Sequence, residues 1–270
     1  MFALTALLVG AVAAPRPAGA QQRLATPRSP SFASKWDGQN FSHRLFDSLL
    51  RRHVKRGRVD YAGIRRHSMS LLLEYQHRLA KTNPARLKGG KAARLAFWIN
   101  AHNAFALREV LRQGRRLAKA RRRVKAAAGA QRRNRLLFQV GGRWYTTAQI
   151  RNRVIRGRFK DPRALFALVG SSGDPWLRAR AYTGRKLARR LRAVARRFLS
   201  HPNLGVNLDR KKKIVLLPQV FSRYAKDFAG SRWKGAVSFV ADHLKNAQDA
   251  AFIKANLARL TIRYRPNPRP

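Results

Sequence analysis

The sequence predicts an α+β fold, a helix-dominated single domain with two β-hairpins and a short C-terminal strand. Most of the chain repeats apolar residues at every third or fourth position, which is the period of an amphipathic helix. Two pairs of short β-prone runs flank tight turns, the first at Gly141-Gly142 and the second at Asp209–Lys212. No repeat with a period of about 20–50 residues is visible, so the pattern does not indicate a solenoid or a propeller.

The first half of the expected domain alternates helices with clear breaks. Helices are expected over residues 41–54, 63–82 and 91–114, and the first hairpin over 136–146. The stretch 57–64 (GRVDYAGI) is predicted to be a turn or a short extended piece. Asn83-Pro84 ends the second helix because a residue before proline avoids the helical region, and Gly114 is expected to end the third.

The second half repeats this organisation. Helices are expected over residues 148–159, 181–199, 220–230, 237–247 and 249–260, with the second hairpin over 204–217 and the last strand over 261–264. Thr146 or Thr147 is expected to cap the helix over 148–159, and Thr183 the helix over 181–199, because their hydroxyls can accept hydrogen bonds from the first turn. The latter helix has its leucines on one face and its arginines on the other.

The charge of the chain is extreme for a globular protein. Its apolar content of 45% is ordinary, but 60 Lys and Arg residues stand against 11 Asp and Glu residues, for a formal net charge of +49. A GC-rich genome would account for arginine but not for the missing acids. Binding to a polyanion or an anionic membrane surface would favour such a charge. An acidic compartment would favour it too, because carboxylates lose their native pairing there.

The N-terminus is typical of an export signal. Residues 2–14 (FALTALLVGAVAA) have the length of a signal h-region, and Ala18–Ala20 form a small-x-small cleavage site. We therefore expect a signal peptide over 1–20, a flexible linker over 21–40, and a periplasmic or extracellular mature chain without a transmembrane segment. A buried or membrane-retained helix is the alternative, since no basic residue precedes the apolar run.

Two amides lie on the inner side of the helix over 91–114. Asn100 and Asn103 align with Ala96 and Leu107 beside the apolar surface, so both are expected to be buried and hydrogen-bonded. They either clamp the backbone of a neighbouring loop or orient a catalytic or ligand group. His102 lies off this line and is expected at a partly exposed edge.

Residues 115–136 form a basic low-complexity insertion of Ala, Arg and Lys. It is either a solvated, partly helical segment or an arm that binds phosphates or anionic surfaces. It has no aromatic residue for base stacking, so its attraction to a polyanion would be non-specific. The candidate polyanion-binding residues are Arg115, Arg116, Arg121, Arg122, Arg123, Lys125, Arg132, Arg133 and Arg135.

Four motifs occur in an order that resembles domain-of-unknown-function family 547. They are GRVDYAGI (57–64), LAFWINAHNAFAL (95–107), FKDPRALFALVGSSGDPWLRARAYTG (159–184) and LLPQVFSRYAKDFAG (216–230). The family has no established activity, and its bacterial members are often small exported proteins. The resemblance therefore implies a fold and export more than a chemistry.

The third motif departs from the family at residues 165–177. Relatives resemble a pattern with His and two Cys there, whereas this chain has Leu165, Val169-Gly170 and Asp174, and no cysteine anywhere. Cysteine-dependent catalysis is excluded. The remaining catalytic candidates are Asp174, Asn100, Asn103, Ser171 and Ser172, although no histidine stands at a motif position to activate a serine.

Some residues at motif positions are expected to be structural. Asp161 precedes Pro162 as a helix N-cap does, and Asp60 and Asp227 are expected to pair with arginine or to accept backbone hydrogen bonds. The full structural set is Asp60, Asp161, Arg163, Tyr182 and Asp227. No metal site and no cofactor is indicated.

Three functions are consistent with these features. The first is a non-catalytic exported domain, a pseudoenzyme, whose basic surface binds an anionic envelope component or polyanion. The second is a hydrolase- or transferase-like enzyme using the loop over 170–177 with Asn100 and Asn103. The third is a structural or interaction domain whose charge reflects genome bias alone.

Overall fold

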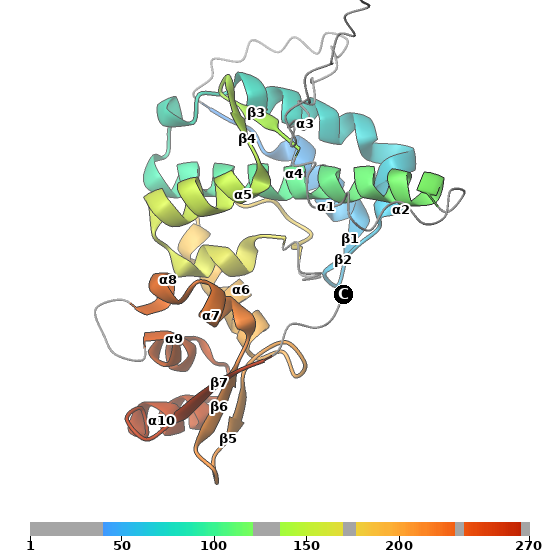
Figure 1. The fold of residues 1–270 in the computed structure, drawn as a ribbon. Helices are drawn as coiled ribbons and strands as arrows, with labels where there is room; N and C mark the ends of the chain where they lie inside the picture. Colours follow the sequence, from blue (N-terminus) through green and yellow to red (C-terminus); the bar gives the residue numbers. More distant parts are fainter. Residues whose placement is uncertain (1–39, 121–135, 170–176, 230–234, 266–270) are drawn as a thin grey trace, which may run out of the picture.

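The helices and strands of the chain are shown in Figure 1, in a computed structural model that describes residues 40–120, 136–169, 177–229 and 235–265. The helix-dominated α+β fold is confirmed. The expected signal peptide, most of the linker and of the basic insertion, and the tail from residue 266 lie outside the described residues. So does the segment 170–176.

A small hairpin that the sequence did not indicate connects the first two helices. α1 (Arg44–His53) leads into β1 (Val54–Lys55) and β2 (Arg58–Val59), which pair antiparallel. The turn between them has Arg56 and Gly57 at positive φ. α2 (Tyr61–Gly63), the π-helix η1 (Ile64–Ser68) and α3 (Met69–Lys81) then follow without a break. The expected turn over 57–64 thus contains a strand and the start of a helix, so the described residues form three hairpins rather than the expected two.

The long helix α4 runs from Gly90 to Ala120, after the 3₁₀ turn η2 (Pro84–Arg86). The expected end at Gly114 is wrong. A glycine inside a helix costs only about 1 kcal/mol, and the residues after it are Arg, Leu, Ala and Lys, which are strong helix formers.

The first predicted hairpin is confirmed. β3 (Phe138–Val140) and β4 (Arg143–Tyr145) pair antiparallel around Gly141-Gly142. Gly141 has φ +55°, and a Cβ there would lie 2.6 Å from the Thr82 carbonyl oxygen, so the turn fits against the end of α3 only as glycine. Thr146 caps α5 (Thr147–Gln149) in a capping box with Gln149, and the π-helix η4 (Ile150–Phe159) continues it.

The predicted helix over 181–199 begins later than expected. The 3₁₀ helix η5 (Pro162–Ala167) precedes it, and α6 spans Leu187–Leu199. Lys186, at φ 64°, stands at the N-cap position without a side-chain hydrogen bond. Thr183 does not cap the helix, because its hydroxyl donates to the Arg185 carbonyl at 3.2 Å.

The C-terminal part combines a three-stranded sheet with four short helices. β5 (Asn207–Asp209) and β6 (Ile214–Leu217) form the second predicted hairpin, and β7 (Thr261–Tyr264) pairs with β6 in parallel. The helices are α7 (Gln219–Arg223), α8 (Ala225–Ala229), α9 (Gly235–His243) and α10 (Ala247–Ala255). Within the described ranges, no helix combines the length and the apolar character needed to cross a membrane.

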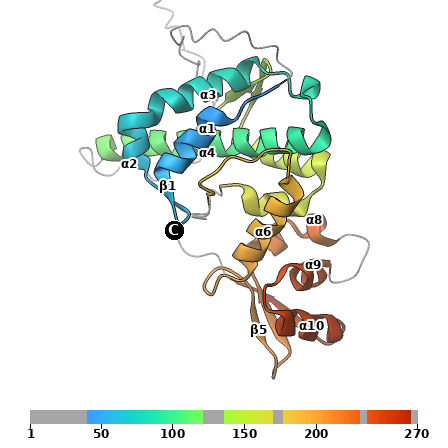
Figure 2. The ribbon, with the colours of Figure 1, turned by 180° about the vertical axis from the view of Figure 1, so that it is seen from behind.

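The buried side chains form two clusters that α6 joins. The first cluster gathers α1, α3, α4, β3 and η4, and the second gathers the sheet with α7 to α10. Leu187 and Leu191 of α6 belong to the first cluster, while Ala195 and Leu199 belong to the second. Seen from behind, α6 lies between the two parts (Figure 2). Residues of η5 also belong to both clusters, Ala164 and Ala167 to the first and Leu165 and Phe166 to the second. η5 and α6 therefore connect the two halves of the molecule.

Candidate functional site

Asn100 on α4 holds the backbone of Tyr182. Its Nδ2 donates to the Tyr182 carbonyl oxygen at 2.8 Å, and the Tyr182 N–H donates to Asn100 Oδ1 at 2.9 Å. The Asn100 side chain is fully buried and Tyr182 is nearly so. Tyr182 belongs to neither a helix nor a strand, so its backbone has no hydrogen-bond partner from secondary structure. The Asn100 amide supplies that partner for both its N–H and its C=O.

Asn103, one turn along the same helix, holds a second segment. Its Nδ2 donates to the Ala167 carbonyl oxygen at 2.9 Å, and the Val169 N–H donates to its Oδ1 at 2.9 Å. Ala167 and Val169 immediately precede the stretch 170–176, and Tyr182 follows it. Both amides thus clamp the backbone of neighbouring segments and do not orient a catalytic or ligand group. The clamped residues lie on either side of the loop in the third motif.

The catalytic candidates of the loop over 170–177 are not among the described residues. Ser171, Ser172 and Asp174 lie outside the described residues. Of the loop over 170–177, the structure describes Leu177, which is buried.

The candidate polyanion arm is largely outside the described ranges as well. Arg115 and Arg116 lie in the last turns of α4. Arg121, Arg122, Arg123, Lys125, Arg132, Arg133 and Arg135 fall in the segment that the structure does not describe.

His102 is buried, and its expected place at an exposed edge is wrong. Its side chain is 1% exposed, because α4 is packed by α3 on one side and by η4 on another. Its Nδ1 lies 3.3 Å from Asn103 Oδ1. Burial lowers the pKa of His102 to about 4, against a smaller opposing effect of the Asn103 hydrogen bond.

Glu109, two turns further along α4, is a partly buried carboxylate. The Thr147 hydroxyl donates to its Oε1 at 3.1 Å. Burial raises the pKa of Glu109 to about 7, although the Thr147 hydrogen bond and the charge of Arg151 act in the opposite direction. In the described part of the chain, no three His, Asp or Glu side chains gather as a metal site would require.

Asp60 joins a short polar chain that runs into the first cluster. Its Oδ1 accepts the Gly63 N–H at 2.8 Å and caps α2, and its Oδ2 lies 3.6 Å from His53 Nδ1. His53 Nε2 lies 2.8 Å from the Ser68 hydroxyl. The hydrogen bond from the Gly63 N–H lowers the pKa of Asp60, and the contact with His53 lowers it further.

The order Ser68–His53–Asp60 is that of a serine nucleophile with its base and acid. The Ser68 side chain is completely buried, however, so a substrate carbonyl has no access to its hydroxyl. We interpret these three linked side chains as a structural connection between α1 and η1. Sequence reasoning missed it because neither His53 nor Ser68 stands in a functional motif.

The other two motif carboxylates also bind within the protein. Asp161 accepts the Arg163 N–H at 3.1 Å and pairs with its guanidinium at 2.8 Å. Asp227 on α8 forms two hydrogen bonds with the guanidinium of Arg156 on η4, one of them at 3.1 Å. The Arg156 guanidinium also lies 4.4 Å from the centre of the Tyr224 ring.

Every carboxylate in the described ranges has a partner. Each of the following binds a backbone N–H, a hydroxyl or a cation: Asp47, Asp60, Glu74, Glu109, Asp161, Asp209, Asp227, Asp242 and Asp249. The two other acids, Asp37 and Asp174, are not described. Since Lys and Arg outnumber the acids by more than five to one, these pairs leave most of the positive charge uncompensated.

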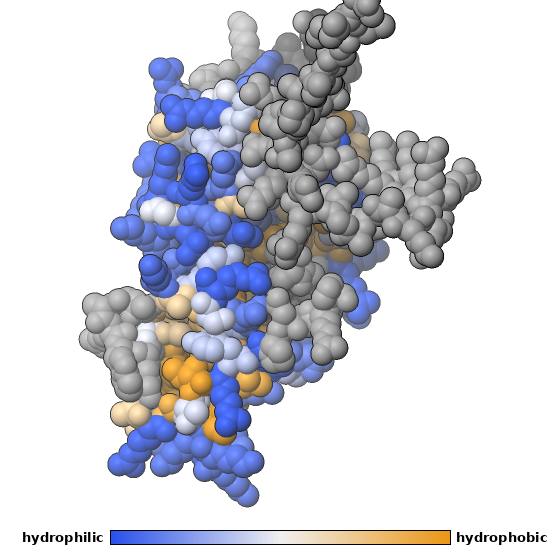
Figure 3. Space-filling view, in the orientation of Figure 1, coloured by the Kyte–Doolittle hydropathy of each residue, from blue (hydrophilic) through white to orange (hydrophobic). Residues whose placement is uncertain are grey.

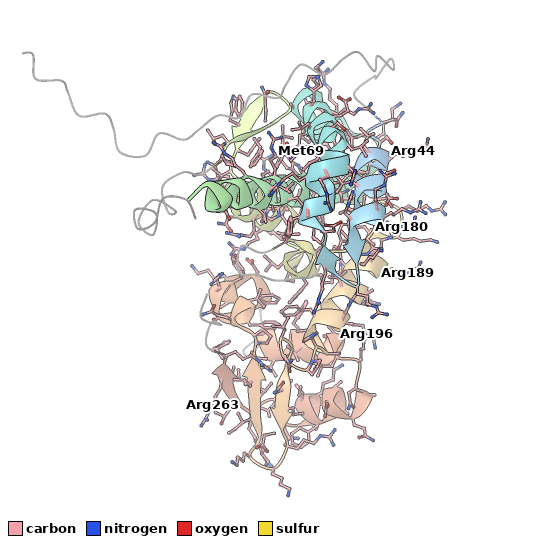
Figure 4. The ribbon with its side chains drawn as sticks, turned by 90° about the vertical axis from the view of Figure 1, so that its right-hand side faces the viewer. Arg44, Met69, Arg180, Arg189, Arg196 and Arg263 are labelled. Atoms are coloured by element: carbon pink, nitrogen blue, oxygen red, sulfur yellow. The ribbon has the colours of Figure 1, made fainter. Side chains whose placement is uncertain are left out.

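Part of the positive charge of the molecule gathers along one side. Figure 4 shows Arg44 of α1, Arg180, and Arg189 and Arg196 of α6 one after another along this side, and all four are exposed. We call these four residues the basic stripe. Asp47 pairs with Arg180 at 3.8 Å and accepts the Ala181 N–H. On the face in Figure 3, hydrophilic residues cover most of the described surface, and apolar residues gather in its lower part.

A known protein family matches the part of the chain that contains the two amide clamps. The family model described as "Protein of unknown function, DUF547" matches residues 85–199, from η2 to the end of α6. The match contains Asn100, Asn103 and both segments that they clamp, whereas the motifs over 57–64 and 216–230 lie outside it. No curated protein and no solved structure matches the chain. The match supports the resemblance to the DUF547 family that the motifs indicated, over residues 85–199.

Proposed function

We propose that this protein is a non-catalytic, exported domain that binds an anionic polymer or an anionic envelope surface through its basic surface. The observation that carries the proposal is the charge imbalance of the described surface. The carboxylates of the described ranges all have partners within the chain, while the four arginines of the basic stripe are exposed and only Arg180 among them pairs with one of these carboxylates, Asp47. Such a surface attracts polyanions through the release of their counterions.

The two amides favour binding over the enzyme alternative. A hydrolase or transferase using Asn100 and Asn103 would need them to face a reacting group. Instead, the oxygen and the nitrogen of each amide bond to backbone. Export rests on the sequence of residues 1–20, and the sequence of a mature N-terminus from culture medium or periplasm tests it.

Long-chain polyphosphate is a suitable probe for the basic surface. We expect its affinity to fall steeply as salt rises, because each phosphate contact releases counterions. Replacement of Arg189 and Arg196 by Gln should lower the salt slope by about two, one for each lost contact. The matched control is Arg259→Gln with Arg263→Gln, which removes the same charge from exposed positions outside the stripe.

The outcomes separate polyanion binding from genome bias. Salt-independent or absent binding would leave genome bias as the source of the charge. Equal losses in both double variants would show that net charge alone attracts the polymer and that the basic stripe is not its site.

A further inference from the structure

A cleft of about 180 Å³ opens between η5 and α6, where these elements connect the two halves. Its apolar wall includes Phe166, Leu177 and Phe198. Three arginines, Arg178, Arg190 and Arg197, also line it, and none of the described residues that line it is acidic. The cleft thus combines an apolar surface with a concentration of positive charge.

Two of the cleft arginines, Arg178 and Arg190, are held in place around Tyr182. The Arg178 guanidinium lies 5.2 Å from the centre of the Tyr182 ring. Arg190 Nη1 donates to the Thr183 hydroxyl at 3.0 Å. Since Asn100 fixes the Tyr182 backbone, the clamp described above also positions this pair of cations.

One donor of this pair of arginines lacks an acceptor in the described part of the chain. Arg178 Nη1 is buried and, among the described residues, has no hydrogen-bond partner. A buried donor without an acceptor is unfavourable. Burial and then the charges of Arg178 and Arg189 lower the pKa of Arg190, which indicates that the two cations of the cleft repel each other. Asp47 acts on Arg190 in the opposite sense, but its side chain is bound to Ala181 N–H.

We propose that this cleft binds an organic oxyanion, a phosphate or carboxylate head on an alkyl or aryl chain. The head lies between Arg178 and Arg190, where it supplies the missing acceptor and separates the two cations. A guanidinium presents its N–H groups in a planar fork that matches both oxyanions. The chain lies against Phe166, Leu177 and Phe198. This site is separate from the basic stripe and does not depend on polymer binding.

Octyl phosphate, measured by titration calorimetry, is the probe. We expect saturable binding of one molecule, with inorganic phosphate at least about tenfold weaker because it lacks the chain, and with no binding of octanol. Arg178→Gln and Arg190→Gln should each weaken binding by about tenfold or more. Arg192→Gln is the control, since Arg192 is exposed on the same helix and does not line the cleft.

A second pair of variants does not alter charge. Ala193 lines the cleft from α6, and Ala193→Leu should fill it and abolish octyl phosphate binding while leaving polyphosphate affinity unchanged. Ala188→Leu, at an exposed position of the same helix, should leave both unchanged. Thermal unfolding establishes that each variant folds.

Three results would overturn the proposal. They are the absence of saturable octyl phosphate binding to the wild type, equal affinity for inorganic phosphate, and losses in Arg192→Gln or Ala188→Leu as large as those in the cleft variants. A failure of polyphosphate binding alone would count against the proposed function and not against the cleft.

Discussion

Asn100 and Tyr182 lie 82 positions apart and exchange two hydrogen bonds in the core, at 2.8 and 2.9 Å. A buried side chain here satisfies the donor and the acceptor of one distant residue. The contact connects the longest helix to the segment after the family loop, and it supports the ring against which Arg178 lies.

Asn100→Ala should therefore destabilise the fold strongly. The change leaves the N–H and the C=O of Tyr182 buried without partners, at about 1–3 kcal/mol each. Urea unfolding should show a loss on the order of 3 kcal/mol. The control Asn203→Ala, at an exposed site, should change the free energy of unfolding by less than about 0.5 kcal/mol. Similar small changes in both variants would contradict the clamp.

Gly63→Ala should disrupt the start of α2. A Cβ at Gly63 would lie 2.0 Å from Asp60 Oδ2 and 2.8 Å from His53 Nδ1, so the cap and the polar chain to Ser68 must separate. Overpacking of this kind costs about 1–3 kcal/mol. At Gly157 the corresponding nearest atom is 3.5 Å away, and Gly157→Ala should be neutral or stabilising by up to about 1 kcal/mol. Thermal unfolding of the two variants compares them, and equal melting temperatures would be inconsistent with this packing.

Glu109→Gln should stabilise the protein at neutral and alkaline pH. Burial raises the folded-state pKa of Glu109 from 4.5 to about 7, so the folded state binds the proton more tightly than the unfolded state. The stability of the wild type should fall as pH rises from about 4.5 to about 7. Above that window the variant should gain on the order of 2–3 kcal/mol, and below pH 4.5 the gain should vanish.

Urea unfolding of both proteins across this pH range tests whether Glu109→Gln is stabilising above pH 7 and neutral below pH 4.5. Glu74→Gln, which removes the ion pair with Arg78, is the matched control and should not stabilise the fold. A pH-independent gain in Glu109→Gln would show that the effect is not the ionisation of this carboxylate.

Much of the fold could be predicted because its signals are local. The capping box at Thr146, the turn at Gly141-Gly142, the stop at Asn83-Pro84 and the cap at Asp161 all depend on residues within a few positions of one another. Local signals failed where two of them competed. Gly114 has the composition of a helix end, but the helix formers after it continue α4. Thr183 has the chemistry of a cap, but the helix begins only at Leu187, after Lys186 in the left-handed region.

The candidate site could be predicted only in part, for the same reason. The helical spacing of Asn100 and Asn103 indicated two buried amides, but their partners lie 82 and 64 positions away. The burial of His102 depends on η4 covering α4, and nothing near His102 in the sequence indicates that contact. The Arg178–Arg190 cleft likewise exists only because η5 and α6 pack together.

The amino-acid sequence by itself determined the helix-rich fold class, most of the elements, the charge imbalance, the resemblance of residues 85–199 to the DUF547 family and the absence of cysteine chemistry. These follow from composition, periodicity and short motifs, which act along the chain. Only the tertiary structure decided which backbone the amides hold, which carboxylate is buried beside which hydroxyl, and where arginines meet an apolar wall. Those relationships join segments far apart in sequence, and packing of the whole core is what brings them within hydrogen-bond distance.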